Sequence, residues 1–314
     1  MWYTKFLGKN KIVDYLFRQT IRLTLSYRLS KKNNHKYYII CRPHPAGFFS
    51  DFFYVLGHIA LAKKNNLIPF VDMKNYPFLY QDFPSYGGIE NGWEQYFKQG
   101  CSIEEAYSDK YILCEEKYPY GLVPYYSTTN LFNEGKPTKR KISELNGLIK
   151  EYVPIRDEIL NEFKLISDSN DIKNCVGVHI RGTDMKNTPG HNKPETLNQT
   201  IERIRKLVDT HNFKKIFLCT DEKNTVEVIK QAFDGVLEVV CLDTYRTVGT
   251  EGIHLEKDPI IKRDFHKYNM GYEVLRDAYL LSECKALICG KSNVAYAAMV
   301  FNNNNYEWID CKSK

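Results

Sequence analysis

NCVGVHIRGTD, residues 174–184, is an apolar run of strand length that ends in a turn of charged residues and glycine. Similar apolar runs follow at 214–220, 236–242 and 285–290, and helical patterns at 195–210, 223–233, 271–283 and 293–301 alternate with them. Continuous apolar strands that alternate with helices are typical of a parallel sheet covered on both faces. We therefore expect an α/β fold with a doubly wound sheet in this part of the chain.

The first half of the chain contains one similar unit. An apolar run at 37–42 is followed by the loop PHPAGFFSD (43–51), and a helix expected to begin at Ser50 or Asp51 leads to a second apolar run at 67–73. This order predicts a parallel β-loop-α-β unit.

A domain boundary is expected near the polar stretch SDSND (167–171). It follows two helical patterns at 143–152 and 155–166, whereas residues 76–140 lack a clear period. We thus expect a first domain of residues 37–168, with a basic segment of residues 1–36 attached to it, and a second domain of residues 169–314.

Charge is unevenly distributed along the 314 residues. Residues 1–36 carry a net charge of +8 within a total of +6, so the remainder is close to neutral. This distribution predicts a localised contact with an acidic surface and disfavours nucleic acid as a partner. Apolar residues recur among the cations of residues 10–30 at helical spacing, which predicts a helix that either lies on an anionic membrane or packs on the body with its charges in water.

The nine cysteines are odd in number, lack C-x-x-C spacing and in several cases lie inside apolar runs. This usage is typical of buried free thiols in a reducing compartment. The chain shows no apolar stretch of about 18 residues and no signal-peptide pattern. We therefore expect a cytoplasmic protein, with residues 1–36 as a peripheral contact on the inner face of the membrane.

The residues that follow each apolar run are the candidates for chemistry, because ligands of open parallel sheets bind beyond the carboxyl ends of the strands. The guanidinium of Arg181 is a planar fork that matches a diphosphate and can neutralise charge on a departing nucleotide. Alternatively, Arg181 ties its loop to Asp184 or to a helix end. Asp184 either orients Arg181 or accepts a proton from an acceptor hydroxyl.

The segment SNVAYAAM (292–299) is predicted to begin a helix directly after the last apolar run. Its exposed N–H groups, together with the side chains of Ser292 and Asn293, are suited to binding a phosphate. Ser292 can also cap its own helix.

Several motifs are absent from the sequence. It contains no G-x-G-x-x-G after a strand, no P-loop, no D-x-D and no H-E-x-x-H. Charge on a leaving group must then be met by Arg, Lys and helix ends, so we expect a metal-independent reaction without a cofactor.

HIRGTD (179–184), the block GYEVLRDAYLLSECKALICGKSNVAYAAM (271–299) and NGWEQYF (91–97) together resemble the fucosyltransferase superfamily, which includes α1,6-fucosyltransferases, nodulation fucosyltransferases and protein O-fucosyltransferases. The resemblance implies a GT-B fold, in which two Rossmann-like domains face each other across a cleft. It further implies that the C-terminal domain binds most of a GDP-sugar donor, which is a substrate, and that the reaction inverts the anomeric centre without a metal.

The resemblance also assigns roles to individual positions. Carried over to this sequence, it implies a β-phosphate contact for Arg181, a place beside the nucleotide for His179, guanine recognition for Asp277, an acidic turn at Asp221, and phosphate contacts for Ser292 and Asn293. Some relatives have a glutamate base a few residues after the signature aspartate, but Met185 follows Asp184 here and Pro189 stands where that glutamate would align. The base is therefore open among Asp184, Glu195, His44 and Asp51.

The expected activity is transfer of a deoxysugar, with fucose favoured by analogy, from a GDP-sugar to a hydroxyl of a glycan acceptor during assembly of a bacterial surface polysaccharide. A donor such as GDP-heptose is an alternative. A non-catalytic carbohydrate- or polyanion-binding protein of the same fold is another, because of the missing glutamate and the basic N-terminal segment.

Overall fold

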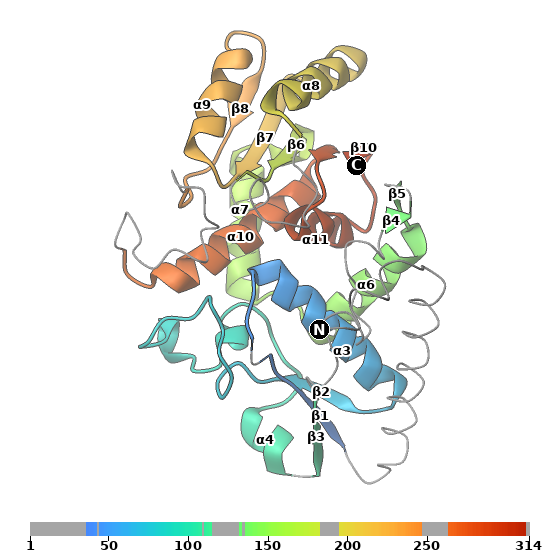
Figure 1. Cartoon of the computed structure of the whole chain (residues 1–314), viewed down its shortest axis with the longest axis vertical. Helices are drawn as coiled ribbons and strands as arrows, with labels where there is room; N and C mark the ends of the chain where they lie inside the picture. Colours follow the sequence, from blue (N-terminus) through green and yellow to red (C-terminus); the bar gives the residue numbers. More distant parts are fainter. Residues whose placement is uncertain are drawn as a thin grey trace, which may run out of the picture.

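The computed structural model describes residues 36–42, 44–108, 110–114, 132–133, 136–182, 195–246 and 263–311. Within these ranges the chain forms two larger parallel sheets with helices between and around them (Figure 1). The amphipathic helix expected in residues 10–30 lies outside the described residues, and so does Asp184. No helix in the described ranges is both long and apolar enough to cross a membrane.

The first sheet has three parallel strands in the order β2-β1-β3. They are β1 (Tyr37–Ile40), β2 (Ile68–Val71) and β3 (Tyr111–Leu113), and helix α3 (Phe48–Lys64) connects β1 to β2. The predicted β-loop-α-β unit is therefore confirmed. The segment without predicted elements holds the short helices η1 (Tyr86–Gly88), η2 (Gly92–Gln95) and α4 (Ile103–Ser108).

Helix α3 begins at Phe48, so the expected start at Ser50 or Asp51 was wrong by two to three residues. Asp51 lies in the first turn and does not cap the helix, because its carboxylate is engaged in a buried ion pair. The Asp51 carboxylate accepts the backbone N–H of Ala46 at 3.1 Å and lies 2.5 Å from Nη1 of Arg42. From the first turn of α3, Asp51 thereby stabilises the loop that connects β1 to this helix.

The second sheet has five parallel strands in the order β10-β9-β6-β7-β8. The strands are β6 (Val176–Ile180), β7 (Lys215–Thr220), β8 (Glu238–Val240), β9 (Ala286–Cys289) and β10 (Trp308–Cys311). The helices between them are α8 (Leu197–His211), α9 (Lys223–Ala232), α10 (His266–Glu283) and α11 (Asn293–Asn302). The predicted doubly wound sheet is confirmed, with β10 as an edge strand that the apolar pattern did not predict.

Side chains on the two faces of the second sheet enter different cores, because successive residues of a strand point to opposite faces. Val176 and Val178 of β6 pack in one core with Ile204 of α8, while Phe217 and Cys219 of β7 belong to the other. Both faces are therefore apolar, which explains the continuous apolar runs in the sequence.

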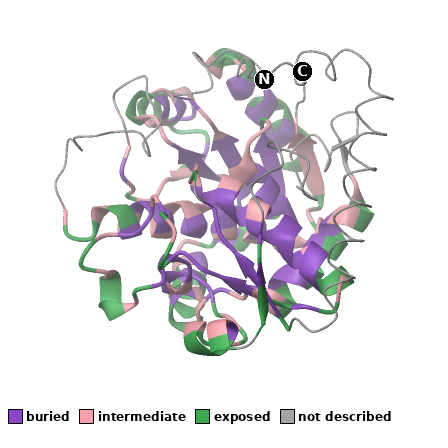
Figure 2. Ribbon diagram, turned by 60° about the horizontal axis from the view of Figure 1, so that its bottom comes forward, coloured by how far each residue is buried: buried purple, intermediate pink, exposed green. Residues whose placement is uncertain are grey.

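The region between the two sheets is filled by helices that share one hydrophobic core (Figure 2). Helices α6 (Lys139–Tyr152) and α7 (Asp157–Ser169) join α10 and α11 there, and α11 contacts both α3 and α6. Phe52 of α3, Leu145 of α6 and Leu281 of α10 all lie in this core with no more than 1% exposure. One face of the second sheet thus shares a buried helical core with the first sheet.

Candidate functional site

Parallel pairing of β6 with β7 brings Arg181 and Asp221 together. Ile180 and Thr220 are paired in register, so the next residue of each strand leaves the sheet at the same edge. Nη1 of Arg181 lies 3.3 Å from Oδ2 of Asp221, and the N–H of Gly182 donates to Oδ1 of Asp221 at 2.9 Å. Asp221 therefore positions both the guanidinium and the turn that carries it.

Glycine at position 182 has a steric cause. A Cβ atom built there would overlap the carboxyl group of Glu222, which follows the neighbouring strand. Glycine therefore lets the turn after β6 lie directly against the Glu222 side chain, which a larger residue would have to displace. The glycine of the HIRGTD segment supports the placement of Arg181 next to it.

His179 and Ser292 meet in the same way, through the pairing of β6 with β9. Nδ1 of His179 lies 3.3 Å from Oγ of Ser292, and this Oγ accepts the N–H of Ala295 at 3.1 Å, which caps α11 as predicted. Burial, together with the charge of Arg181, lowers the pKa of His179 to about 4 against the opposing effect of Asp221. His179 is therefore neutral at pH 7.

Asp277 lies on α10 with its side chain 19% exposed. Burial raises the pKa of its carboxyl group to about 6, against the opposing effect of Arg276 and Arg246. Nη2 of Arg276 lies 3.6 Å from Oδ1 of Asp277, and it also donates to the carbonyl oxygen of Asp243 at 3.0 Å. Asp277 is thus a largely ionised acceptor at pH 7 in a poorly solvated place.

The segment after β8 is tied to α10 by Glu273. Its carboxylate accepts the N–H of Tyr245 at 3.1 Å and two N–H groups of Arg263, one of them at 3.0 Å. Glu273 lies one helical turn before Asp277, so both carboxylates lie on the same face of α10. This arrangement holds the loop backbone against the helix face that carries Asp277.

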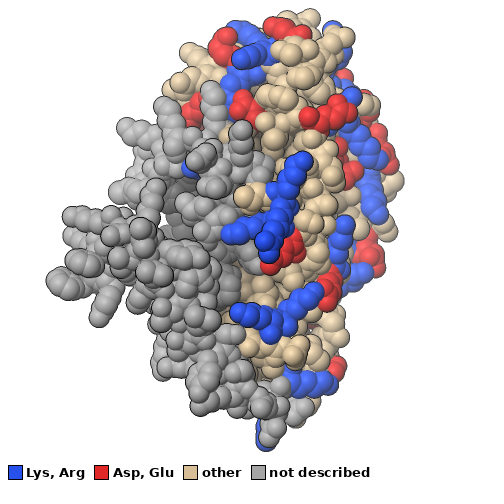
Figure 3. Space-filling model, turned by 90° about the vertical axis from the view of Figure 1, so that its right-hand side faces the viewer, with Lys and Arg blue, Asp and Glu red and all other residues tan. Residues whose placement is uncertain are grey.

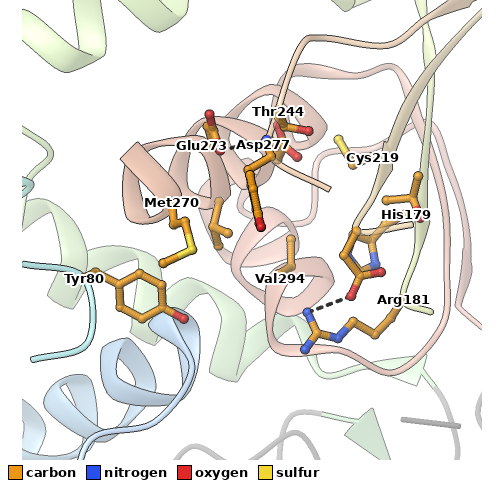
Figure 4. A pocket seen from close by; sticks show the side chains of 13 residues that line it. Tyr80, His179, Arg181, Cys219, Thr244, Met270, Glu273, Asp277 and Val294 are labelled. Atoms are coloured by element: carbon orange, nitrogen blue, oxygen red, sulfur yellow. Dashed lines mark hydrogen bonds and ion pairs between the residues drawn. The ribbon is translucent and has the colours of Figure 1, made fainter. Parts of the chain in front are cut away.

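One pocket, shown in Figure 4, is lined by several of these groups: His179, Arg181, Asp221, Tyr245, Glu273 and Asp277. Of the predicted site residues, the structure brings His179, Arg181, Asp221 and Asp277 into it. Thr220, which the carboxyl-end rule also indicates beside Asp221, lines the pocket as well. Sequence reasoning missed the other lining residues, which are Tyr80, Cys219, Thr244, Tyr245, Met270, Glu273, Val274 and Val294. Tyr80 comes from the first half of the chain and had no signal in the sequence.

The two kinds of polar group in this pocket suit two parts of one ligand. Arg181 and the first turn of α11, which contributes Val294, favour an anion such as a diphosphate. Asp277 offers a carboxylate that can accept hydrogen bonds from the N–H edge of a base. The pocket therefore has the donors and acceptors to bind a nucleoside diphosphate.

The remaining candidates lie elsewhere. Glu195 pairs with the buried Arg203 at 2.5 Å, and Arg203 also pairs with Asp310 at 2.7 Å, so Glu195 belongs to an ion-pair network. Asn293 is the first residue of α11, but neither it nor Ser292 is among the residues that line the pocket in the described ranges.

The first half of the chain supplied two further candidates. His44 is exposed in the loop between β1 and α3. Asp51 is fully buried, and burial raises the pKa of its carboxyl group to about 7, against the stabilising charge of Arg42. Because Asp51 is enclosed by the loop that it braces, we assign it a structural role.

Comparison with solved structures identifies fucosyltransferases as structural neighbours. The fucosyltransferase NodZ from Bradyrhizobium has a TM-score of 0.51 and 17% identity, with 84% of this chain and 93% of that chain covered. NodZ alpha-1,6-fucosyltransferase co-crystallised with GDP has a TM-score of 0.49 and 16% identity, over 84% of this chain and 92% of that chain. POFUT1 in complex with GDP has a TM-score of 0.40 and 11% identity, over 88% and 73%.

No family profile and no curated protein matches the sequence. The likeness to NodZ is therefore one of structure, and it agrees with the two parallel sheets described above. The chain has the GT-B fold, with two Rossmann-like units, and its structural neighbours are the fucosyltransferases that the sequence resembles.

Proposed function

We propose that the protein is an inverting, metal-independent glycosyltransferase that moves a deoxysugar, fucose, from a GDP-sugar to a hydroxyl of a glycan acceptor. The observation that carries the proposal is that Arg181 and Asp277 line the same pocket. One matches the diphosphate and the other the N–H edge of guanine, at the two ends of GDP. The fold shared with the NodZ fucosyltransferase supports this choice among nucleotide-binding functions.

Arg181 is the main source of positive charge at the phosphate end, because burial keeps His179 neutral at pH 7. The Arg181 side chain is 29% exposed while it pairs with Asp221. Figure 4 shows it at the wall of the pocket. A guanidinium held in this way does not have to reorganise when negative charge grows on the leaving group. We therefore assign the stabilisation of departing GDP to Arg181 and to the amino end of α11.

The reaction is a single displacement. The acceptor hydroxyl oxygen forms a bond to the anomeric carbon while the bond from that carbon to the β-phosphate oxygen breaks, and the hydroxyl proton passes to a base. Glu195 is a poor choice for this base because its carboxylate is bound to Arg203. His44 and Asp184 are the better candidates, since His44 is exposed beside α3 and Asp184 follows Arg181 by three residues.

The alternatives make different use of the same fold. GDP-heptose would occupy the same nucleotide pocket and differ only in the sugar. A polyanion-binding protein needs a continuous basic surface. Figure 3 shows Lys and Arg interspersed with Asp and Glu over the described part of one face, which favours the pocket over the surface as the site of function. As part of the proposal, residues 1–36 contact an anionic membrane on the cytoplasmic side, where the glycan is assembled.

Titration with GDP and a turnover assay together test the proposal. Purified protein should bind GDP, and it should release GDP from GDP-fucose faster than from GDP-mannose, GDP-heptose or UDP-sugars when a glycan acceptor is present. Arg181→Ala should reduce turnover by about a hundredfold or more. Arg205→Ala is the matched control, because Arg205 is an exposed residue of α8 that pairs with Glu202 at 2.9 Å.

Two outcomes would overturn the assignment. The first is a folded Arg181→Ala protein with nearly full turnover. The second is binding of GDP without turnover of any GDP-sugar over a broad set of glycan acceptors, which would favour the non-catalytic alternative.

A further inference from the structure

Helix α10 begins without a side-chain cap of its own. Its N-cap residue, Phe265, has a left-handed backbone with φ 48° and provides no side-chain acceptor. The first N–H groups of a helix need acceptors from outside the helix. Here they come from Asp82, whose two carboxylate oxygens accept the N–H groups of Lys267 at 3.3 Å and Tyr268 at 2.9 Å.

Asp82 belongs to the first Rossmann-like unit, which contains the sheet β2-β1-β3, whereas α10 belongs to the second unit, which contains the five-stranded sheet. This cap therefore connects the two units. Asp82 lies 186 residues before Tyr268 in the chain. A carboxylate at the amino end of a helix also interacts favourably with the helix dipole. The first turn of α10 therefore depends on the placement of a loop that follows β2.

Aromatic residues pack between the loop after β2 and the start of α10, next to this cap. The ring of Tyr86 stacks on that of Tyr268 at 3.8 Å between centroids and 8° between planes. The hydroxyl of Tyr96 lies 2.7 Å from the carbonyl oxygen of Tyr80 and 3.0 Å from that of Tyr268, so it bridges the two segments. Such close packing fixes the loop against the helix.

Gly271 shows how close this approach is. A Cβ atom built there would lie 2.7 Å from Cζ of Tyr96 and 3.0 Å from Cβ of Tyr80, which is closer than real Cβ contacts allow. Glycine inside a helix costs about 1 kcal/mol relative to alanine. At this position it lets the helix pass directly over the aromatic residues of the first unit.

The loop after β2 and helix α10, which meet at this contact, also contribute residues to the pocket. Tyr80, two residues before Asp82, lines the pocket from the first unit, while Met270, Glu273, Val274 and Asp277 line it from α10. The hydroxyl of Tyr80 also accepts the first N–H of α3, from Phe48, at 2.9 Å. Tyr80 is therefore held from two directions, and Asp82 joins its segment to the opposite wall of the pocket.

We propose that Asp82 is a positioning residue of the nucleotide pocket: by capping α10 from the first unit, it sets the distance between Tyr80 and the α10 face that carries Asp277. The inference rests on the proposed function, because it assigns that pocket to GDP. It gives the first unit a role in binding the donor, in addition to any contact with the acceptor.

Three variants test this role. Asp82→Ala removes both acceptors, Asp82→Asn keeps one carbonyl oxygen, and Ser102→Ala removes a comparable cap from α4, where Ser102 accepts the N–H of Glu105 at 3.2 Å far from the pocket. We expect Asp82→Ala to raise the Kd for GDP and the donor KM at least fivefold with a smaller change in kcat. Asp82→Asn should recover most of the affinity, and Ser102→Ala should lower the thermal midpoint without changing the Kd.

Hydrogen exchange of the α10 amides provides a measurement that needs no ligand. Asp82→Ala should accelerate exchange along residues 269–278, and Ser102→Ala should not. Wild-type Kd and wild-type exchange in Asp82→Ala would overturn the inference, and so would equal Kd values for the Ala and Asn variants. If Asp82→Ala does not fold, Tyr86→Leu provides the same comparison by removing the stack on Tyr268. Failure of the wild-type protein to bind GDP would instead refute the proposed function, and the exchange data would still test the cap.

Discussion

Binding of a GDP-sugar should weaken about tenfold when the pH falls from 8 to 5, through the protonation of Asp277. Burial raises the pKa of this carboxyl group to about 6. With that value, about 99% of the group is ionised at pH 8 and roughly 10% at pH 5. The N–H edge of guanine needs the ionised form as its acceptor, so affinity is complete above the pKa and is lost as the pH falls through it.

Replacement of the carboxylate separates this effect from other titrations. In Asp277→Asn the amide offers one oxygen and turns an N–H₂ group toward the donors of guanine, so the protein loses one charge-assisted hydrogen bond. A loss of about 2 kcal/mol, or roughly thirtyfold in Kd, follows. The variant should also lack the pH dependence between 5 and 8, whereas His179, with a pKa lowered to about 4, stays neutral throughout this range.

The same substitution should act in the opposite direction on stability. The folded-state pKa of Asp277 lies above the ordinary value of 3.8, so its contribution to stability is present at low pH and is lost as the pH rises through about 6. Asp277→Asn removes a carboxylate that is costly to bury, and the unliganded variant should therefore gain stability at pH 8 relative to wild type.

Calorimetric titration with a GDP-sugar is the appropriate assay, because the terminal phosphate of free GDP titrates in the same pH range. The corresponding inosine nucleotide, which lacks the exocyclic amine of guanine, is the matched ligand and should bind wild type more weakly but Asp277→Asn with little further loss. Equal Kd values for wild type at pH 5 and pH 8, or a pH profile that persists in Asp277→Asn, would refute the reasoning.

The other predictions concern the turns and the base. Gly271→Ala should raise the Kd for GDP, measured by titration, because the new methyl group must displace a buried tyrosine at the junction; an unchanged Kd would contradict this. Gly182→Ala should lower kcat more than the thermal midpoint, since the new methyl group must displace the Glu222 side chain that lies against the turn next to Arg181. Glu195→Gln should lower the thermal midpoint with kcat nearly kept, whereas His44→Ala should lower kcat by about a hundredfold or more if this histidine takes the proton. A large kcat loss in Glu195→Gln alone would reverse the two assignments.

The central strands of the second sheet, β9, β6 and β7, were predictable because they are buried on both faces. A strand of this kind is a short unbroken apolar run, as in β6 and β7, and the helices between such runs are visible from their spacing. Strand β10 was missed because it lacks this burial. It lies at the edge of the sheet, and all four of its residues, Trp308–Cys311, are only partly buried. Glu307 and Asp310 therefore interrupt the pattern.

The strand pattern alone located site residues only where the order of strands determines their place. Arg181 and Asp221 follow strands that pair in register, so the carboxyl-end rule located both of them, whereas Asp277 on α10 was located by the family resemblance. The rule does not extend to Tyr80, which lines the pocket from the first half of the chain, or to Asp82, which lies at a contact between segments far apart in sequence. The expected start of α3 was wrong because Asp51 lies in the first turn, where its carboxylate pairs with the buried Arg42 instead of capping the helix.

Desolvation disfavours the charged form of both His179 and Asp277, so it moves their pKa values in opposite directions. It keeps His179 uncharged and brings Asp277 close to neutrality, with pKa values of about 4 and about 6. A neutral His179 can accept or donate at Ser292 without adding positive charge, so the electrostatic attraction for a diphosphate comes from Arg181 and the helix end. Asp277, in contrast, keeps its charge at pH 7 because Arg276 and Arg246 partly offset its burial. A nucleotide with N–H groups at its base edge completes that compensation, which is why an exchange of guanine for a base without such donors should cost most of the affinity.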